Sequence, residues 1–185
     1  MNRVSNRPRL WTIGHSNHAL PDFIALLQVH DIAGVVDVRR VPHSRRNPQF
    51  GRERLAEALG AAGIRYDHLE GLGGMRTPDG TAANAGLGVA LLRGYADYMQ
   101  TPSFARELEA LLVLSTERRT AFMCAEAGPA DCHRSLIADA VTACGIAVGH
   151  ILADRGTVRH VLRDGARVKG STVSYPAMQG GFWDA

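Results

Sequence analysis

Short apolar runs alternate with amphipathic segments along most of the chain. The apolar runs predict buried strands over residues 10–14, 33–38, 64–69, 120–124 and 146–152. Apolar residues at helical spacing predict helices over residues 21–30, 52–62, 87–100, 103–116 and 132–144. This alternation favours an α/β fold. We expect a single three-layer domain, with a mostly parallel sheet of about five strands flanked by helices.

The pattern weakens at both ends of the 185-residue chain. We therefore divide it into an N-terminal extension (1–9), an α/β domain (10–152) and a C-terminal extension (153–185). In the C-terminal extension, Asp164-Gly165 lies between two β-prone runs and predicts a hairpin turn. The final stretch, SYPAMQGGFWDA, is expected to be poorly ordered unless it docks on a neighbouring part of the protein.

The amino-acid composition indicates an ordinary globular protein. Hydrophobic residues make up 45% and charged residues 21%, as in ordinary globular proteins. No apolar run approaches the roughly 20 residues that span a membrane, and the basic N-terminus lacks a secretory apolar region. We expect a cytoplasmic protein without a membrane partner. Three cysteines, an odd number, argue against a disulfide framework.

Unusual polar residues follow the predicted strands. In parallel sheets, ligands bind outside the carboxyl ends of the strands, so residues from different loops converge there. The residues placed at this edge are His15, Asn17, Asp37, Arg39, Arg40, His68, Cys124 and Glu126. Their convergence indicates a site at the carboxyl edge of the sheet.

The densest chemistry lies in the stretch FMCAEAGPADCHRS, residues 122–135. We expect Asp131 to cap a helix whose first turn holds Cys132. Free backbone N–H groups there bind anions, with Arg134 as a second contact, and they lower the pKa of a thiol. Cys132 is thus a candidate nucleophile, although a purely packing role is the plainer alternative. Cys124 ends a buried strand, so this small hydrophobic residue is expected in the core or at its rim. A disulfide or redox pair with Cys132 is the alternative, although seven intervening residues match no known redox motif.

Several residues are candidates for moving protons. Glu126, where the loop leaves its strand, is a general base, a partner of Arg134 or His133, or an ordinary surface acid. His133 and His15 are acid–base candidates, whereas His150 fits a buried structural histidine equally well. No paired Cys or His spacing typical of zinc sites is present, so we assign no metal ligand and no cofactor.

The loop after the second predicted strand is rich in arginine. Lys169 is the single lysine in the chain, so arginine carries nearly all of the positive charge. The stretch RRVPHSRRNPQF fits either phosphate recognition or a solvated surface loop. It places together Arg39, Arg40, Arg45 and Arg46, with Ser44 and Gln49. Asp37 and Arg39 can also pair with each other as scaffolding. Gly73-Gly74 permits close approach of backbone to a ligand, or a simple turn.

Several motifs in order resemble one family. They are TIGHSN (12–17), VVDVRRVPHSRRNPQF (35–50), IRYDHLEGLGG (64–74), YADYM (95–99), FMCAEAGPADCHRSLIADAV (122–141) and VGHIL (148–152). Together they resemble the domain of unknown function 488 family of bacteria and archaea, from Leu10 to Leu152. The resemblance implies a compact α/β domain and no established reaction. The signature positions that it implies include His15, Asp37, Arg39, Ser44, Arg45, His68, Gly73, Gly74, Cys124, Glu126, Cys132, His133 and Arg134.

The sequence leaves three hypotheses for function. The first is an enzyme that acts on a phosphate-bearing substrate, a nucleotide or a nucleic acid. Its catalytic residues are Cys132, His133, Glu126, His15 and Cys124, and its substrate-binding residues are Asp37, Arg39, Ser44, Arg45, His68, Gly73, Gly74 and Arg134. The second is a non-catalytic nucleotide or nucleic-acid binding module. The third is a metal-binding domain that uses Cys124, Cys132 and histidines.

Overall fold

A six-stranded β-sheet forms the centre of the computed structural model, which describes residues 10–130 and 132–177. The strand order is β3-β2-β4-β1-β5-β6; the first five strands are parallel, and β6 is antiparallel to β5. The strands are β1 (Leu10–Gly14), β2 (Gly34–Asp37), β3 (Arg65–His68), β4 (Thr120–Cys124), β5 (Val148–Ile151) and β6 (Thr157–Arg159). The predicted mostly parallel sheet is confirmed, and β6 is an additional strand.

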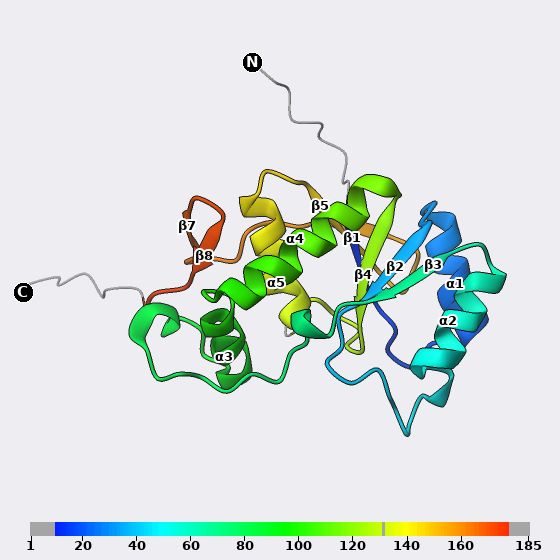
Figure 1. Ribbon diagram of the computed structural model, residues 1–185, viewed down its shortest axis with the longest axis horizontal. Helices are drawn as coiled ribbons and strands as arrows, with labels where there is room; N and C mark the ends of the chain where they lie inside the picture. Colours follow the sequence, from blue (N-terminus) through cyan, green and yellow to red (C-terminus); the bar gives the residue numbers. More distant parts are fainter. Residues whose placement is uncertain (1–9, 131, 178–185) are drawn as a thin grey trace, which may run out of the picture.

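Helices cover both faces of the sheet and make the fold a single three-layer α/β domain, as predicted (Figure 1). One face carries α1 (Leu20–Val29) and α2 (Arg52–Ala61). The other face carries α3 (Ala90–Tyr98), α4 (Pro102–Glu117) and α5 (His133–Ala143). Among the described residues, no helix is long and apolar enough to cross a membrane.

The alternation of side chains along each strand separates two cores. Trp11 and Ile13 of β1 pack in the core under α1 and α2, whereas Leu10 packs in the core under α3, α4 and α5. In β4, Met123 joins the first core and Cys124 the second. Successive strand residues point to opposite faces, so a parallel sheet buried on both sides needs apolar residues at nearly every position.

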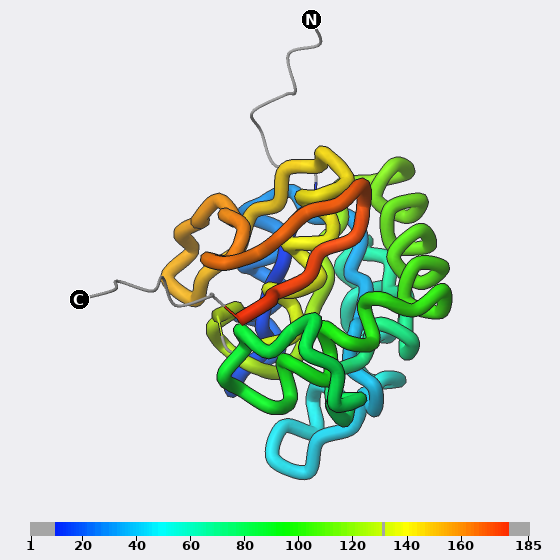
Figure 2. Tube along the Cα trace, turned by 90° about the vertical axis from the view of Figure 1, so that its left-hand side faces the viewer, coloured from blue at the N-terminus to red at the C-terminus, as the bar shows by residue number. Residues whose placement is uncertain are grey.

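The described part of the C-terminal extension belongs to this fold. After β6, the hairpin of β7 (Arg167–Lys169) and β8 (Thr172–Ser174) turns at Gly170 rather than at the predicted Asp164-Gly165. Tyr175, just after β8, is buried, and its backbone bonds to Asn84 and Gly86. Figure 2 shows this segment in orange and red, folded back against the body of the protein. Residues 178–185 of the predicted poorly ordered tail lie outside the described residues.

The topology opens a crevice between β1 and β4. Their carboxyl ends are in register, with Gly14 opposite Cys124. The chain leaves β1 through α1 towards β2, but it leaves β4 through α5 and crosses to β5 on the far side of β1. Neighbouring strands whose connections diverge in this way create the crevice where ligands bind in α/β sheets.

Candidate active site

A cavity of about 300 Å³ opens at the carboxyl edge of β1, β2 and β4. Its size suits a small-molecule ligand. Four of its lining residues are Cys124, Glu126, Cys132 and His133, which we call the thiol cluster. The other lining residues are His15, Arg39, Arg40, Val41, His43, Ser44, Gly74, Met75, Leu91, Leu92 and Ala125.

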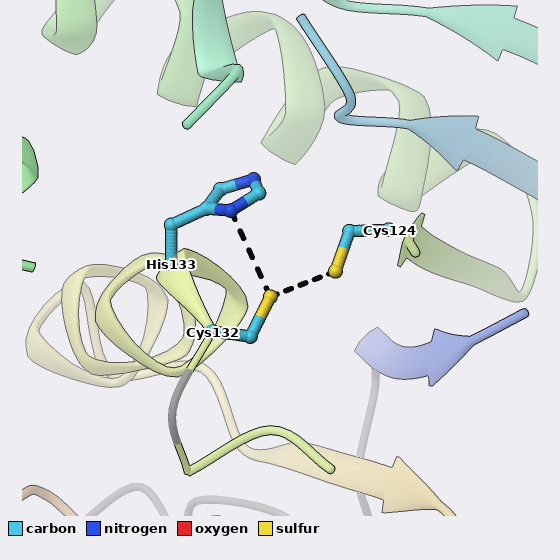
Figure 3. A group of neighbouring side chains, drawn as sticks. All are labelled: Cys124, Cys132 and His133. Atoms are coloured by element: carbon cyan, nitrogen blue, oxygen red, sulfur yellow. Dashed lines mark hydrogen bonds between the residues drawn. The ribbon is translucent and has the colours of Figure 1, made fainter. Parts of the chain in front are cut away.

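The two cysteines of the thiol cluster are in direct contact. Both are reduced and buried, and their Sγ atoms lie 2.7 Å apart. Figure 3 shows Cys132 between Cys124 and the ring of His133. The loop after β4 returns to the same strand end, so residues eight apart in sequence meet. Their unfamiliar spacing therefore does not exclude a chemical partnership between the thiols.

The Cys132 sulfur itself occupies the position at the start of α5 where the sequence predicted a bound anion. Cys132 is the N-cap residue, and its Sγ accepts from the backbone N–H of Arg134 at 3.4 Å. The Cys124 hydrogen bond, followed by His133 and Arg134, lowers the pKa of Cys132 to about 5 despite its burial. Helix N-termini favour negative charge in this way. The structure therefore corrects the predicted cap at Asp131, a residue that lies outside the described part of the chain.

Cys124 is the thiol that keeps its proton. Burial, together with its contact to Cys132, raises the pKa of Cys124 well above the ordinary value. Glu126 Oε2 lies 2.7 Å from Cys124 Sγ and 3.3 Å from Cys132 Sγ. Partial burial raises the pKa of Glu126, but the hydrogen bonds from the thiols outweigh it and keep that pKa below its usual value. One Cys124 proton thus faces two acceptors, and it can serve only one at a time.

Contacts with Val38 and Gly74 fix the orientation of the His133 ring. Its Nε2 lies 3.1 Å from the carbonyl oxygen of Val38, to which an Nε2–H donates, and its Nδ1 lies 3.7 Å from Cys132 Sγ. Gly74 packs against the ring, because a Cβ there would lie 2.8 Å from Nδ1. The ring can therefore exchange a proton with the Cys132 thiol through Nδ1 while Val38 holds its other nitrogen.

Arg134 holds the loop after β4 instead of facing the cavity. It is 1% exposed, and its Nη2 donates to the carbonyl oxygens of Glu126, Ala127 and Gly128 at 2.6, 3.3 and 3.2 Å. A Cβ at Gly14 would collide with this guanidinium and with the Glu126 carbonyl. The contacts of Arg134 thus favour positioning of Glu126 over the substrate contact expected from the sequence.

Asp37 and Arg39 form a buried scaffold at the side of the cavity. Arg39 donates to both Asp37 oxygens, from Nη2 at 2.5 Å and from Nε at 2.9 Å. Its Nη1 lies 3.2 Å from His15 Nε2, and the Nδ1 of His15 bonds to the Ser16 carbonyl. Burial, with the charge of Arg39, lowers the pKa of His15 to about 4. His15 lines the cavity as a neutral ring with both nitrogens engaged, which disfavours a general-base role.

The arginine-rich loop divides between the cavity and solvent. Ser44 lines the cavity and accepts from the Asn47 backbone, whereas Arg45 is exposed and lies outside the lining. Arg40, whose Nη1 lies 3.3 Å from the Met75 carbonyl, is the exposed cation of the lining. The structure therefore places Arg40, and not Arg45, where a bound anion would be in reach.

His68 and Gly73 support the site from outside it. His68 Nε2 lies 2.8 Å from the Arg39 carbonyl, and the side chain does not line the cavity. Gly73 passes against the backbone of Arg40, where an added Cβ would lie 2.6 Å from the Arg40 Cα. Close approach explains both glycines of the Gly73-Gly74 pair, but the neighbours are protein atoms.

Sequence reasoning missed the apolar part of the cavity mouth. Val41, Met75 and Leu91 are 68%, 77% and 60% exposed and line the cavity. Leu91 carries a signal in the sequence, because it lies off the buried stripe of α3 that includes Leu92 and Tyr95. Met75 carries none, since its place depends on how the long loop after β3 folds. These side chains give the mouth an apolar side next to the cationic Arg40.

A second buried polar group lies behind the thiol cluster and outside the cavity lining. We call it the Asp139 network: Thr12, Asp139, His150, His160 and Tyr175. Thr12 Oγ1 lies 2.8 Å from His150 Nδ1, His150 Nε2 lies 2.9 Å from His160 Nδ1, and His160 Nε2 lies 2.8 Å from Asp139. Tyr175 donates to the other Asp139 oxygen at 2.6 Å. His150 is thus a buried histidine with both nitrogens paired, the plainer of its two predicted roles.

Comparisons with known proteins agree with the resemblance in the motifs. The family model described as "Domain of unknown function DUF488" matches residues 19–141, more than half of the chain. The matched range includes α1 to α4 and most of α5, and every residue of the thiol cluster. A search of curated proteins and a search of solved structures each found no match. The chain belongs to the family described as domain of unknown function DUF488.

Proposed function

We propose that the protein is an enzyme that uses the Cys132 thiolate as a nucleophile on a small phosphate-bearing substrate. The observation that carries this proposal is the position of Cys132 Sγ. It caps the N-terminus of α5, has a pKa lowered to about 5, and lines a cavity that suits a small ligand. A thiolate that is ionised at neutral pH and faces a ligand cavity is the arrangement that nucleophilic catalysis requires.

The neighbours of Cys132 supply the proton transfers. Cys132 Sγ would donate an electron pair to the electrophilic atom of the substrate, and the bond to the leaving group would break. The Cys124 proton, 2.7 Å away, would pass to the leaving group, with Glu126 or His133 as the next proton carrier. Water then displaces the sulfur from the intermediate, and one proton of that water returns to Cys124.

The walls of the cavity favour a substrate with an anionic end. Arg39 is neutralised by Asp37, so Arg40 carries the available positive charge, with Ser44 and His43 beside it as hydrogen-bonding groups. Guanidinium groups bind phosphate in a bidentate manner. Glu126 lies beside the two thiols and disfavours an anion there, so the phosphate is expected near Arg40 and the reacting atom at Cys132.

Turnover of nucleotides and sugar phosphates tests this proposal. For a substrate found in such a panel, Cys132→Ser should abolish turnover while changing binding by only a few-fold. Cys144→Ser is the matched control, because Cys144 lies at the end of α5 outside the cavity lining. Arg40→Ala should weaken binding of the phosphorylated compound more than binding of its dephosphorylated form. Full turnover by Cys132→Ser would overturn the proposal.

A second candidate is binding of nucleic acid along the arginine-rich loop. Arg45 and Arg46 are exposed and lie outside the cavity lining, so they are accessible to an extended phosphate backbone. This function predicts binding that weakens steeply with salt and is lost in an Arg45→Ala/Arg46→Ala double variant. Binding without salt dependence, or unchanged binding by the double variant, would exclude it.

A further inference from the structure

Three donor atoms in the thiol cluster converge on one point. Cys124 Sγ, Cys132 Sγ and His133 Nδ1 all lie within 4.8 Å of one another (Figure 3). We infer that these atoms form a Zn²⁺ site, and that zinc reversibly blocks the nucleophile. The regulatory half of this inference rests on the proposed function, whereas the metal site stands on its own geometry. Two thiolates and one imidazole are a ligand set that zinc prefers.

His133 is already oriented for coordination. An Nε2–H donates to the Val38 carbonyl at 3.1 Å, so the nitrogen that faces the sulfur atoms is Nδ1. Histidines that bind metal commonly donate their other ring N–H to a carbonyl or carboxylate, which fixes the ring and makes it a better ligand. Gly74 lies beside this ring, since a Cβ added there would be 2.8 Å from Nδ1.

The spacings of the donors fit a tetrahedral ion after one small movement. Zinc bonds of ~2.3 Å to sulfur and ~2.0 Å to nitrogen place a sulfur and a nitrogen roughly 3.6 Å apart. Cys132 Sγ and His133 Nδ1 are already 3.7 Å apart. Two sulfur ligands need about 3.8 Å, so the contact of 2.7 Å must open by roughly 1 Å as the ion enters. The cavity lies beside both thiols and provides the space.

Glu126 lies against the two sulfur atoms but outside the group of three converging donors. Its Oε2 contacts both sulfur atoms, at 2.7 and 3.3 Å. Three protein ligands leave the fourth position of a tetrahedral zinc ion to water. Zinc bound in this way would occupy the electron pair of Cys132 Sγ and exclude the electrophile.

Zinc binding can be measured directly on the full chain, purified without a metal-affinity tag and freed of metal under reducing conditions. Competition against a chromophoric chelator should give one zinc per protein. Cys124→Ser and His133→Asn should each weaken affinity at least 100-fold, and Cys144→Ser should leave it unchanged. Binding of Co²⁺ should add thiolate-to-metal absorption, which reports the ligands in the wild-type protein even if a variant misfolds. Zinc held no more tightly by the wild type than by Cys124→Ser, or no thiolate absorption, would overturn the site.

The rate of Cys132 alkylation separates the two proposals. One equivalent of zinc should slow modification of Cys132 by iodoacetamide at least tenfold, and a chelator should restore the rate. If zinc binds through the thiols but the metal-free Cys132 is unreactive, the nucleophile proposal fails and the metal site stands. If Cys132 is reactive and zinc neither binds nor protects it, the metal inference fails and the nucleophile proposal stands.

Discussion

The thiol cluster and the Asp139 network are both polar groups beside the core, yet they differ in how their hydrogen-bonding capacity is used. In the network, Nε2–H tautomers of His150 and His160 satisfy a chain from Thr12 to Asp139. In the thiol cluster, the Cys124 proton faces both Cys132 and Glu126. The cluster also lines the cavity at the carboxyl edge of the sheet, whereas no residue of the network lines that cavity.

This difference distinguishes polar residues that stabilise the fold from polar residues that are available to react with or bind a ligand. Buried polar groups with all partners present stabilise one packing arrangement and have nothing left to offer a ligand. Groups with unused donors or acceptors beside a cavity keep their capacity for a substrate, a proton or a metal ion. We therefore expect changes in the thiol cluster to affect reactivity, and changes in the Asp139 network to affect stability.

The largest expected effect is the loss of reactivity in Cys132→Ser. Iodoacetamide should modify the variant at least 100-fold more slowly at pH 7, measured by intact mass and peptide mapping. Stability should be unchanged or slightly higher, because serine is a good N-cap for α5. If the variant lost several kcal/mol of stability, Cys132 would have a structural role, as the residues of the Asp139 network do.

Asp139→Asn should have the opposite profile. Asp139 accepts from Tyr175 and pairs with His160, so an amide in its place leaves a donor facing a donor. We expect a loss of about 2 kcal/mol in the free energy of unfolding, measured by urea denaturation. Alkylation of Cys132 should stay within threefold of wild type. Asp164→Asn, an exposed position, is the matched control.

A smaller effect should follow His133→Asn. His133 lowers the pKa of Cys132, after the larger contribution of Cys124. Without the ring, the midpoint of the pH profile of Cys132 alkylation should rise by about one unit, or ~1.4 kcal/mol. An unchanged midpoint would show that His133 does not act on the thiol.

The smallest effect concerns acid stability. Burial, with His160 and Arg134 nearby, lowers the pKa of His150 from 6.5 to about 4. Between these values the unfolded chain binds a proton that the folded protein does not, so stability should fall as pH falls from 6.5 to 4. His150→Gln should make the decrease in Tm over this interval shallower, measured by thermal melts at several pH values. An equally steep decrease would assign the acid sensitivity to other groups, such as His15.

Some elements were predicted well from the sequence because nearly every residue in them is apolar and buried. The bounds predicted for β1 and β4 agree with the structure, since both are continuous apolar runs buried on two faces. By contrast, β6 has three exposed residues, and it exists because β5 presents a free edge. Such edge strands depend on tertiary pairing, and their own residues give little signal.

The candidate site was predictable as a location but not as an arrangement. Strand order and the carboxyl-edge rule brought His15, Arg39, Cys124 and Cys132 to one cavity. The sulfur contact could not be read from spacing, because it depends on how the loop after β4 returns. Nor could the sequence show that Arg134 is buried under that loop, since an arginine at a helix start looks the same whether it faces a ligand or carbonyl oxygens.

The pH dependence of Cys132 alkylation is the direct test of whether Cys132 is a thiolate at neutral pH. Peptide mapping after brief exposure to iodoacetamide, at pH values from 4 to 9, gives the rate at each cysteine separately. We expect Cys132 to be alkylated first, with a midpoint near pH 5. Cys124 should keep its proton and remain unalkylated. A Cys132 midpoint near pH 9, or faster modification of Cys124 than of Cys132, would contradict this expectation.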